Sequence, residues 1–224
     1  MTNLIKCRDV AFSYDGKIVL ERVNFEINEG DYLSIIGKNG SGKSTLLKGL
    51  LKLKSPSKGN IEFNNVSDLE IGYLPQQSKN TDDFPASVTE VVLSGRLSSL
   101  GKRLFYNKYD KDIAYKNMEL LGIINLRNKS YRELSGGQKQ RVLLARALSS
   151  AKKIIVTDEP VSSLDSAAVS EFYSLMDKLN KEQGLTVITV SHDMSASIKY
   201  STHILRLEHE QTFFGTTEDY LKIN

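Results

Sequence analysis

A glycine-rich run of nine residues restricts the possible fold more than any other feature of this chain. Residues 37–45 read GKNGSGKST and fit the pattern GxxxxGK[ST], with a short β-type run at 32–36 before them and a helix-like run at 46–51 after them. Glycine allows positive φ and a close approach of the backbone, so consecutive N–H groups can point into one concavity. This order of strand, loop and helix predicts a phosphate-binding P-loop.

The residue types in the loop match the parts of a nucleotide phosphate group. Lys43 can reach the β- and γ-phosphates as a point charge, and the hydroxyl of Ser44 can bind Mg²⁺. An ordinary glycine-rich turn is the alternative, which the flanking strand and helix patterns disfavour. The predicted phosphate contacts are Gly37, Asn39, Gly40, Ser41, Gly42, Lys43, Ser44 and Thr45.

Composition excludes several classes of protein. With 224 residues, of which 40% are hydrophobic and 25% charged, the chain resembles one large or two small globular domains and not a collagenous, coiled-coil or disordered protein. A formal charge of +3, spread along the chain, does not favour a nucleic-acid partner. The single Cys7 cannot form an internal disulfide, and no membrane-spanning run or signal peptide is recognisable. We therefore expect a cytoplasmic protein that is not itself a channel.

The pattern of apolar residues divides the chain into α/β parts and a helical part. Period-two alternation at 4–12 and 23–27, around a turn at 15–17, predicts antiparallel strands. Residues 55–60 are expected to form a loop before further strands at 61–63 and 71–77. From about residue 78 to 145 only helical patterns appear, at 87–93 and at 110–121, where Ile113, Asn117, Leu120 and Leu121 share one side. Strands are predicted again at 153–159, 186–190, 204–207 and 211–215, with a helix from Ser166 to a stop at Gly184.

Charged and polar residues follow the two most apolar strands. In open α/β sheets, ligands lie beyond the carboxyl ends of the strands, where the P-loop, Asp158–Glu159 and His192 all fall. Asp158 is the natural partner of Mg²⁺, and Glu159 is placed to accept a proton from an attacking water. Two adjacent buried acids are costly without a cation, which disfavours a purely structural role. His192 could donate to γ-phosphate oxygens.

A second anion site is predicted at residues 134–138, which read LSGGQ and precede a helix dense in apolar residues. The hydroxyl of Ser135 and the N–H groups of Gly136 and Gly137 would lie at a helix N-terminus. One nucleotide cannot obviously occupy both anion sites of one chain, because the helical part separates them in sequence. A second copy of the protein would resolve the excess.

These motifs together resemble the ATP-binding subunits of ABC transporters over essentially the whole chain. The family's motifs recur in order as Tyr14 (aromatic loop), the P-loop, Gln76 (glutamine loop), Leu134 to Gln138 (signature), Ile154 to Glu159 (Walker B), Ser163-Leu164-Asp165 (D-loop) and His192 (switch histidine). Thr157 departs from the family, which usually has an apolar residue there; we expect it to soften the packing of its strand but to leave the acids in register. An aromatic ring at Tyr14 could stack on a purine, although an ordinary core or surface tyrosine is as good a reading.

The resemblance implies a fold, a reaction and partners. The implied fold is one α/β ATPase domain over residues 1–224, with a mixed core sheet and an antiparallel β-subdomain in 1–77 and 146–224, and a helical insertion at about 78–145. ATP and Mg²⁺ would be bound, with Glu159, His192, Gln76 and Lys43 catalytic and Ser44, Gln76 and Asp158 around the Mg²⁺. The signature, Leu134, Ser135, Gly136, Gly137 and Gln138, and the D-loop Asp165 would act on ATP held by a second copy in a head-to-tail homodimer. Gln76 would link the site to transmembrane permease subunits at the inner face of the membrane.

Within the family, residues 72–76, 84–92 and 95–96 resemble subunits of zinc and manganese importers. Three His and one Cys show no ligand-like spacing, so metal selection would lie in partners, including an extracellular or periplasmic metal-binding protein. Three alternatives stay open: a transporter ATPase for another substrate, a soluble ABC protein acting on nucleic acid or ribosomes, and the ATPase of an exporter. The last two usually carry linked ATPase units or fused membrane helices, which this sequence does not show.

Overall fold

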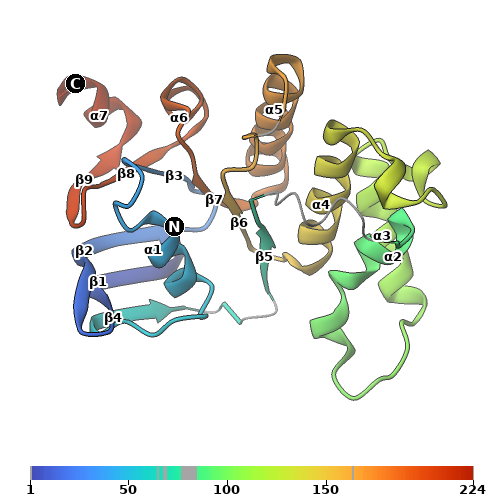
Figure 1. The fold of residues 1–224 in the computed structure, drawn as a ribbon, viewed down its shortest axis with the longest axis horizontal. Helices are drawn as coiled ribbons and strands as arrows, with labels where there is room; N and C mark the ends of the chain where they lie inside the picture. The colour runs from blue at the N-terminus through green and yellow to red at the C-terminus, as the bar shows by residue number, and fades with distance from the viewer. Residues whose placement is uncertain (1, 65, 68–69, 77–84, 163, 224) are drawn as a thin grey trace.

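A computed structural model of the chain describes residues 2–64, 66–67, 70–76, 85–162 and 164–223 and has a six-stranded sheet at its centre. The strands lie in the order β5-β6-β7-β3-β8-β9 (Figure 1). All neighbours are parallel except β8 and β9, which are antiparallel, so the predicted mixed core sheet is confirmed. The strand bounds are β3 Tyr32–Ile36, β5 Ile71–Leu74, β6 Ile154–Asp158, β7 Thr186–Val190, β8 His203–Leu207 and β9 Gln211–Thr216.

A second sheet has three antiparallel strands in the order β2-β1-β4: β1 Asn3–Tyr14, β2 Lys17–Asn28 and β4 Lys58–Phe63. The predicted hairpin is present, with Cys7 opposite Phe25. Its two loop residues, Asp15 and Gly16, have φ of 49° and 77°, as a tight hairpin turn of type I′ requires. The loop expected at 55–60 is shorter than predicted, because β4 already begins at Lys58.

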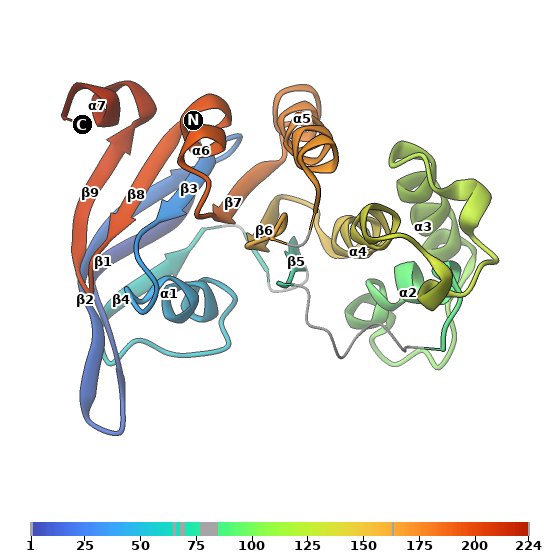
Figure 2. The same cartoon turned by 45° about the horizontal axis from the view of Figure 1, so that its top comes forward.

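The central sheet is buried on both faces, which explains why its strands read as continuous apolar runs. In β6, Ile154 and Val156 point into a core shared with β1, β2 and helix α1 (Lys43–Leu50), while Ile155 points into a core shared with α4 (Gly136–Ser150) and α5 (Ser166–Gln183). Figure 2 shows α1 and α5 on opposite sides of β6.

Residues 85–150 form helices that pack beside the sheet: α2 Val88–Ser94, η3 Leu97–Leu100, α3 Lys108–Leu120, η4 Ile124–Leu126, η5 Tyr131–Glu133 and α4. Helix α2 begins at the predicted capping box of Ser87 and Glu90. The predicted apolar side of α3 is confirmed only in part: Leu121 is buried and Ile113 and Asn117 are half-buried, but Leu120 is exposed. The buried residues within the helix are Asp110, Ala114 and Met118, which the prediction left out.

Asp110 is buried because two arginines meet its carboxylate. Arg96 donates through Nε to Oδ1 at 3.2 Å, and Arg103 donates through Nη1 to Oδ2 at 2.7 Å. The guanidinium of Arg96 also donates to the carbonyl of Ser149 at the end of α4. Burial alone would raise the pKa of Asp110, but the hydrogen bonds from Arg103, Asn107 and Arg96 outweigh it and lower the pKa. The cluster ties the start of α3 to α4 and to the η3 segment.

Two short helices near the C-terminus were not predicted: α6 Met194–Tyr200 and α7 Thr217–Ile223. Each has seven residues, too few for a helical period to be recognised against the neighbouring strands. Helix α5 agrees with the prediction and ends at Gly184, whose φ of 66° suits a left-handed helix C-cap.

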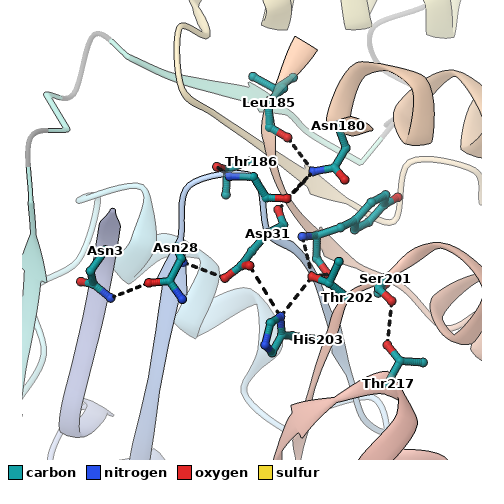
Figure 3. A network of polar contacts seen from close by, with 12 residues as sticks. Asn3, Asn28, Asp31, Asn180, Leu185, Thr186, Ser201, Thr202, His203 and Thr217 are labelled. Carbon is teal, nitrogen blue, oxygen red and sulfur yellow. Dashed lines mark hydrogen bonds and ion pairs between the residues drawn. The ribbon is translucent and has the colours of Figure 1, made fainter. Parts of the chain in front are cut away.

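A polar network closes the edge of the sheet where the parallel strands begin (Figure 3). Asp31, just before β3, accepts from the backbone N–H of Asn28 at 2.7 Å, and the hydroxyl of Thr202 accepts from the N–H of Tyr32 at 2.9 Å. The amide of Asn180, near the end of α5, donates to the carbonyls of Gly30 and Leu185, each at 2.8 Å. These side chains provide hydrogen-bond partners for backbone N–H and C=O groups of the loops at this edge. The candidate site lies at the opposite edge, where the parallel strands end.

Within the residues that the structure describes, no helix is long and apolar enough to cross a membrane.

The buried ion cluster predicts a large loss of stability for Asp110→Ala. Removing the carboxylate leaves the side chain of Arg96, which is 6% exposed, without its counter-charge, at a cost of about 3–5 kcal/mol in the free energy of unfolding. Urea denaturation measures this cost, and Asp112→Ala, at an exposed position of the same helix, is the matched control and should change stability by less than about 0.5 kcal/mol. The carboxylate has a lowered pKa in the folded chain, so its contribution is present above its ordinary value of 3.8 and is lost as the pH falls through the folded pKa. Equal effects of the two substitutions would contradict this account.

Candidate functional site

Three neighbouring strands bring the predicted site residues to one edge of the sheet. The P-loop follows β3, Asp158 ends β6 and His192 comes two residues after β7. Because β7 pairs with both β6 and β3 in parallel, with Val190 opposite Asp158 on one side and Ile35 on the other, the three carboxyl ends are held level. The convergence expected from the sequence is therefore present in the fold.

Glu159 lies between Gln76 and His192. One carboxylate oxygen accepts from Nε2 of Gln76 at 2.9 Å, and the other is 2.6 Å from Nε2 of His192. The side chain of Glu159 is 24% exposed and that of His192 is 43% exposed, so both reach solvent. Residues from three separate loops thus meet at one carboxylate, which can still accept a hydrogen bond from water on its remaining lone pairs.

The backbone of Glu159 is held in an uncommon conformation. Its φ is 44°, which costs a residue with a side chain about 1 kcal/mol or more. The N–H of Glu159 donates to the carbonyl of Val190 at 3.0 Å and extends the β6–β7 ladder by one residue. The left-handed turn directs the carboxylate out of the strand direction toward Gln76 and His192.

The P-loop itself forms the turn into α1. Gly42, with φ of 99°, is the residue before the helix, and the ammonium group of Lys43 donates to the carbonyls of Gly37 at 2.8 Å and Lys38 at 2.9 Å. Two of its three hydrogens are used in these bonds, which leaves one for a ligand. Burial lowers the pKa of Lys43, and the nearby charges of Glu159 and Asp158 oppose that shift. Asn39, Gly40 and Ser44 are exposed, Thr45 is half-buried and Ser41 is buried.

The turn between β8 and β9 holds the outer side of the P-loop, a contact that sequence reasoning missed. The N–H of His209 donates to the carbonyl of Ser41 at 3.2 Å, and its carbonyl accepts from the N–H of Glu21 at 2.9 Å. A side chain at Gly37 would overlap the carbonyl of Leu207, so glycine is required there for this close approach. These contacts use backbone atoms, so no pattern of side chains in the sequence predicts them.

Asp158 sits at the end of β6 in a half-buried position. Burial raises its pKa, the charge of Glu159 raises it further, and Lys43 and His192 act in the opposite direction. A pair of adjacent carboxylates in this setting is stabilised by a cation. The three predicted ligands, Ser44, Asp158 and Gln76, all offer oxygen atoms, which are the ligands that Mg²⁺ prefers. The donor set therefore fits Mg²⁺.

Thr157 does not soften its strand. Its side chain is fully buried, and its hydroxyl donates to the hydroxyl of Thr189 on β7 at 2.8 Å. The polar atom has a partner on the neighbouring strand, one residue before Asp158 and one before Val190. A polar residue in the family's usual apolar position is thus matched by a second polar residue.

A buried glutamine joins the helical part to the site, and it too was missed. Nε2 of Gln140 on α4 donates to the carbonyl of Pro160, directly after Glu159, at 2.6 Å. Gln140 is 2% exposed and lies four residues before the buried Leu144. The sequence could have indicated this contact, because Gln140 is a polar residue at a position on the apolar side of its helix.

The signature residues lie at the start of α4. Ser135 is the N-cap, whose hydroxyl accepts from the N–H of Gln138 at 3.4 Å, while the Gln138 side chain accepts from the N–H of Ser135 at 3.1 Å. Leu134 is buried, and Gly136 and Gly137 form the first turn. Both views place α4 and the P-loop helix α1 on opposite sides of β5, so the two predicted anion sites are separate within one chain (Figures 1 and 2).

Two further predicted residues have local roles. Tyr14 ends β1, which belongs to the three-stranded sheet and not to the sheet that carries the P-loop. Its ring is 40% exposed, with the ammonium of Lys54 3.9 Å from the ring centroid. Asp165 is the N-cap of α5 and accepts from the N–H of Ala168 at 2.9 Å. Ser163 of the D-loop and Phe84 of the importer-like segment lie outside the described residues.

The Thr157–Thr189 pair predicts a non-additive pair of substitutions. Thr157→Val and Thr189→Val should each lower the free energy of unfolding by about 1–2 kcal/mol, because each leaves one buried hydroxyl without its partner. The double variant removes both hydroxyls and should cost less than the sum. A double-mutant cycle by chemical denaturation measures the coupling, and strictly additive losses would contradict it.

Comparison with known proteins agrees with these motifs. Residues 20–162 match the family model described as ABC transporter. The zinc uptake system ATP-binding protein ZurA of Listeria innocua is 34% identical over 98% of this chain and 88% of that protein. The manganese transport system ATP-binding protein MntB of Bacillus subtilis is 36% identical over 98% of this chain and 89% of that protein.

The fold gives the same answer. A solved structure of an ABC transporter in an inward-facing conformation superposes with a TM-score of 0.89 at 32% identity, covering 98% of this chain and 86% of that one. The family match spans more than half of the chain and includes the P-loop, the signature and Asp158–Glu159. The chain belongs to the ABC transporter family, in which it is an ATP-binding subunit and an ATPase.

Proposed function

We propose that this chain powers the import of zinc or manganese ions by hydrolysing ATP, as a homodimer attached to separate permease subunits. The meeting of Gln76, Glu159 and His192 beside the P-loop is the observation that carries the hydrolytic part. The choice of ion rests on the zinc and manganese relatives, whose identities of 34% and 36% do not separate the two metals. We take zinc as the first assignment and manganese as the second, because the segment from residue 84 to Arg96 resembles importers of both metals.

In this proposal, Glu159 accepts the proton from the water that attacks the γ-phosphate. A general base must be held in position, and the contacts from Gln76 and His192 hold the carboxylate at both oxygens. His192, exposed beside it, donates to the γ-phosphate oxygens when the nucleotide enters. Lys43 turns its remaining hydrogen to the phosphates, while the N–H groups of the P-loop surround them.

Mg²⁺ is expected with the nucleotide, held by Ser44, Asp158 and Gln76. When bound, it neutralises charge on the phosphate oxygens. Asp158 must be ionised to serve, and its raised pKa is lowered again by a neighbouring cation. A base stacking on Tyr14 would use the ring face opposite the ammonium of Lys54 or displace that ammonium.

The proposed dimer brings the signature of one copy to the P-loop of the other. The N-terminus of α4, with Ser135 and the following glycines, presents backbone N–H groups that suit an anion, and the P-loop helix of the same chain lies on the other side of β5 (Figures 1 and 2). Asp165, at the N-terminus of α5, would lie at the same contact. A head-to-tail pair gives each ATP one P-loop and one signature.

A groove next to Gln76 suits a docking segment of the permease. It has a volume of about 490 Å³ and is lined by the end of β5, the η3 segment and α4, including Tyr73, Pro75, Leu97 and Arg146. Pro75 directly precedes Gln76, so a segment seated there would be one residue from the glutamine that holds Glu159.

The chain would then lie at the cytoplasmic face of the membrane, and an external metal-binding protein would deliver the ion. A transporter ATPase for a different substrate is the alternative.

The base assignment predicts the behaviour of Glu159→Gln. The substitution keeps the side-chain volume but removes the proton acceptor, so ATP binding should persist while hydrolysis falls by about 10²-fold or more. Because ATP then stays bound, the variant should form a dimer with ATP in size-exclusion chromatography. Adding Ser135→Arg to the same chain should return it to a monomer, since the arginine blocks the partner's site. Near-normal turnover of Glu159→Gln would remove Glu159 from the mechanism.

The metal assignment predicts a growth defect. Cells lacking this subunit should grow poorly in zinc-chelated medium and recover when zinc is added, with manganese tested in parallel. Leu97→Glu, in the groove, should fail to restore zinc uptake although the purified variant keeps its ATPase activity. Normal metal content alongside a defect in sugar, peptide or amino-acid uptake would refute metal import while leaving the ATPase assignment intact.

A further inference from the structure

The connection between η3 and α3 exposes an unusual pair of apolar side chains. Leu104 is 87% exposed and Phe105 is 82% exposed, the two highest values among the large hydrophobic residues that the structure describes. Leu97 and Tyr109, on either side of the connection, are 58% and 65% exposed. Adjacent large apolar residues held in water mark an interaction site more often than scattered ones do.

The same segment is basic. Lys102, Lys108 and Lys111 are exposed, and none of their three ammonium groups has a hydrogen bond or ion pair within the described part of the chain. The one acid among residues 101–111 is Asp110, and its charge is already met by Arg96 and Arg103. Asp112, on the next position of α3, is the nearest exposed acid in sequence. We call residues 101–111 the cationic tip.

The fold holds the cationic tip in place. Arg103, between Lys102 and Leu104, donates to the buried carboxylate of Asp110 at 2.7 Å and to the carbonyl of Ser99 at 2.9 Å. Asn107 caps α3 through a reciprocal pair of hydrogen bonds with Asp110. Leu104 and Phe105 therefore project from a loop fixed at both ends, and Figure 1 shows the connection between α2 and α3 protruding from the helical part.

We propose that the cationic tip binds the surface of an anionic lipid bilayer, with Leu104 and Phe105 inserted among the acyl chains and the three lysines at the headgroups. The cores of protein–protein interfaces are depleted in lysine, whereas a Leu–Phe pair among unpaired lysines matches the composition of interfacial membrane anchors. Each lysine near an anionic surface strengthens binding, and each buried apolar side chain adds to it.

The inference goes beyond the proposed function, because it needs neither ATP nor the permease. Its geometry is compatible with that function: Leu97 and Ser98 line the groove next to Gln76, and the cationic tip follows them after two residues. A permease segment seated in the groove would come from the membrane, so the adjoining tip would face the bilayer. A protein partner for the tip is the competing outcome, which the experiment separates.

Protein-free vesicles give the direct test. The purified chain should co-sediment with vesicles of phosphatidylcholine containing about one quarter phosphatidylglycerol, and not with phosphatidylcholine alone, and raising the salt should release it. Leu104→Ser with Phe105→Ser should weaken the binding about tenfold or more, and Lys102→Gln with Lys108→Gln about tenfold. Leu53→Ser with Ile223→Ser, at positions 72% and 64% exposed, is the matched control and should bind as the native chain does.

A single fluorophore reports the depth of insertion. The chain has no tryptophan, so Phe105→Trp introduces the only one. Its emission should shift to the blue on anionic vesicles and be quenched by lipids brominated on the acyl chains. Leu53→Trp, at a position that is 72% exposed and outside the tip, should show neither change. Thermal unfolding of each variant checks that it is folded.

Three results would overturn the proposal. They are equal binding to neutral and anionic vesicles, binding that survives the Leu104–Phe105 double substitution, and a Phe105→Trp emission that brominated lipid does not quench. If the double substitution abolishes metal uptake in cells while the native chain ignores vesicles, the tip contacts a protein and not lipid. None of these results bears on ATP hydrolysis, so failure here leaves the proposed function standing.

Discussion

The parallel pairing of β7 with β6 and β3 is the contact on which the site depends. It sets Asp158, the P-loop and the His192 loop level with one another, although more than a hundred residues separate the first glycine of the P-loop from Asp158. The ladder does not stop at the last strand residue, because the N–H of Glu159 also bonds to Val190. Both faces of these strands are buried, which leaves the end of the sheet as the place where charged side chains can reach a ligand.

Burial and charge oppose each other throughout the site. Burial lowers the pKa of Lys43, while the charges of Glu159 and Asp158 act to raise it. Burial and the charge of Glu159 raise the pKa of Asp158, while Lys43 and His192 act to lower it. The three groups therefore depend on one another and on any ion that joins them. Kinetic effects of single substitutions at these positions should therefore not be added.

Much of this architecture could be predicted from the sequence. Motifs that use a fixed residue order, such as the P-loop, the capping box at Ser87 and the Gly184 stop, are local, and the chain carries them complete. Predictions failed where the answer depended on tertiary partners. The prediction for α3 left Asp110 out of the buried side, because an aspartate is expected to be exposed unless its ion pairs with Arg96 and Arg103 are known. The turn at His209 acts through its backbone, which no residue pattern records.

The hydrogen bond from Gln140 to Pro160 makes the helix that carries the signature a mechanical extension of the residue that carries the carboxylate. The bond is short and buried, and Glu159 already occupies a strained turn, so the position of α4 and the aim of the carboxylate cannot change independently. A shift of α4 would therefore displace the carbonyl of Pro160, the residue directly after Glu159. Because the signature lies at the N-terminus of the same helix, one buried side chain connects the two sequence motifs that are far apart in the chain.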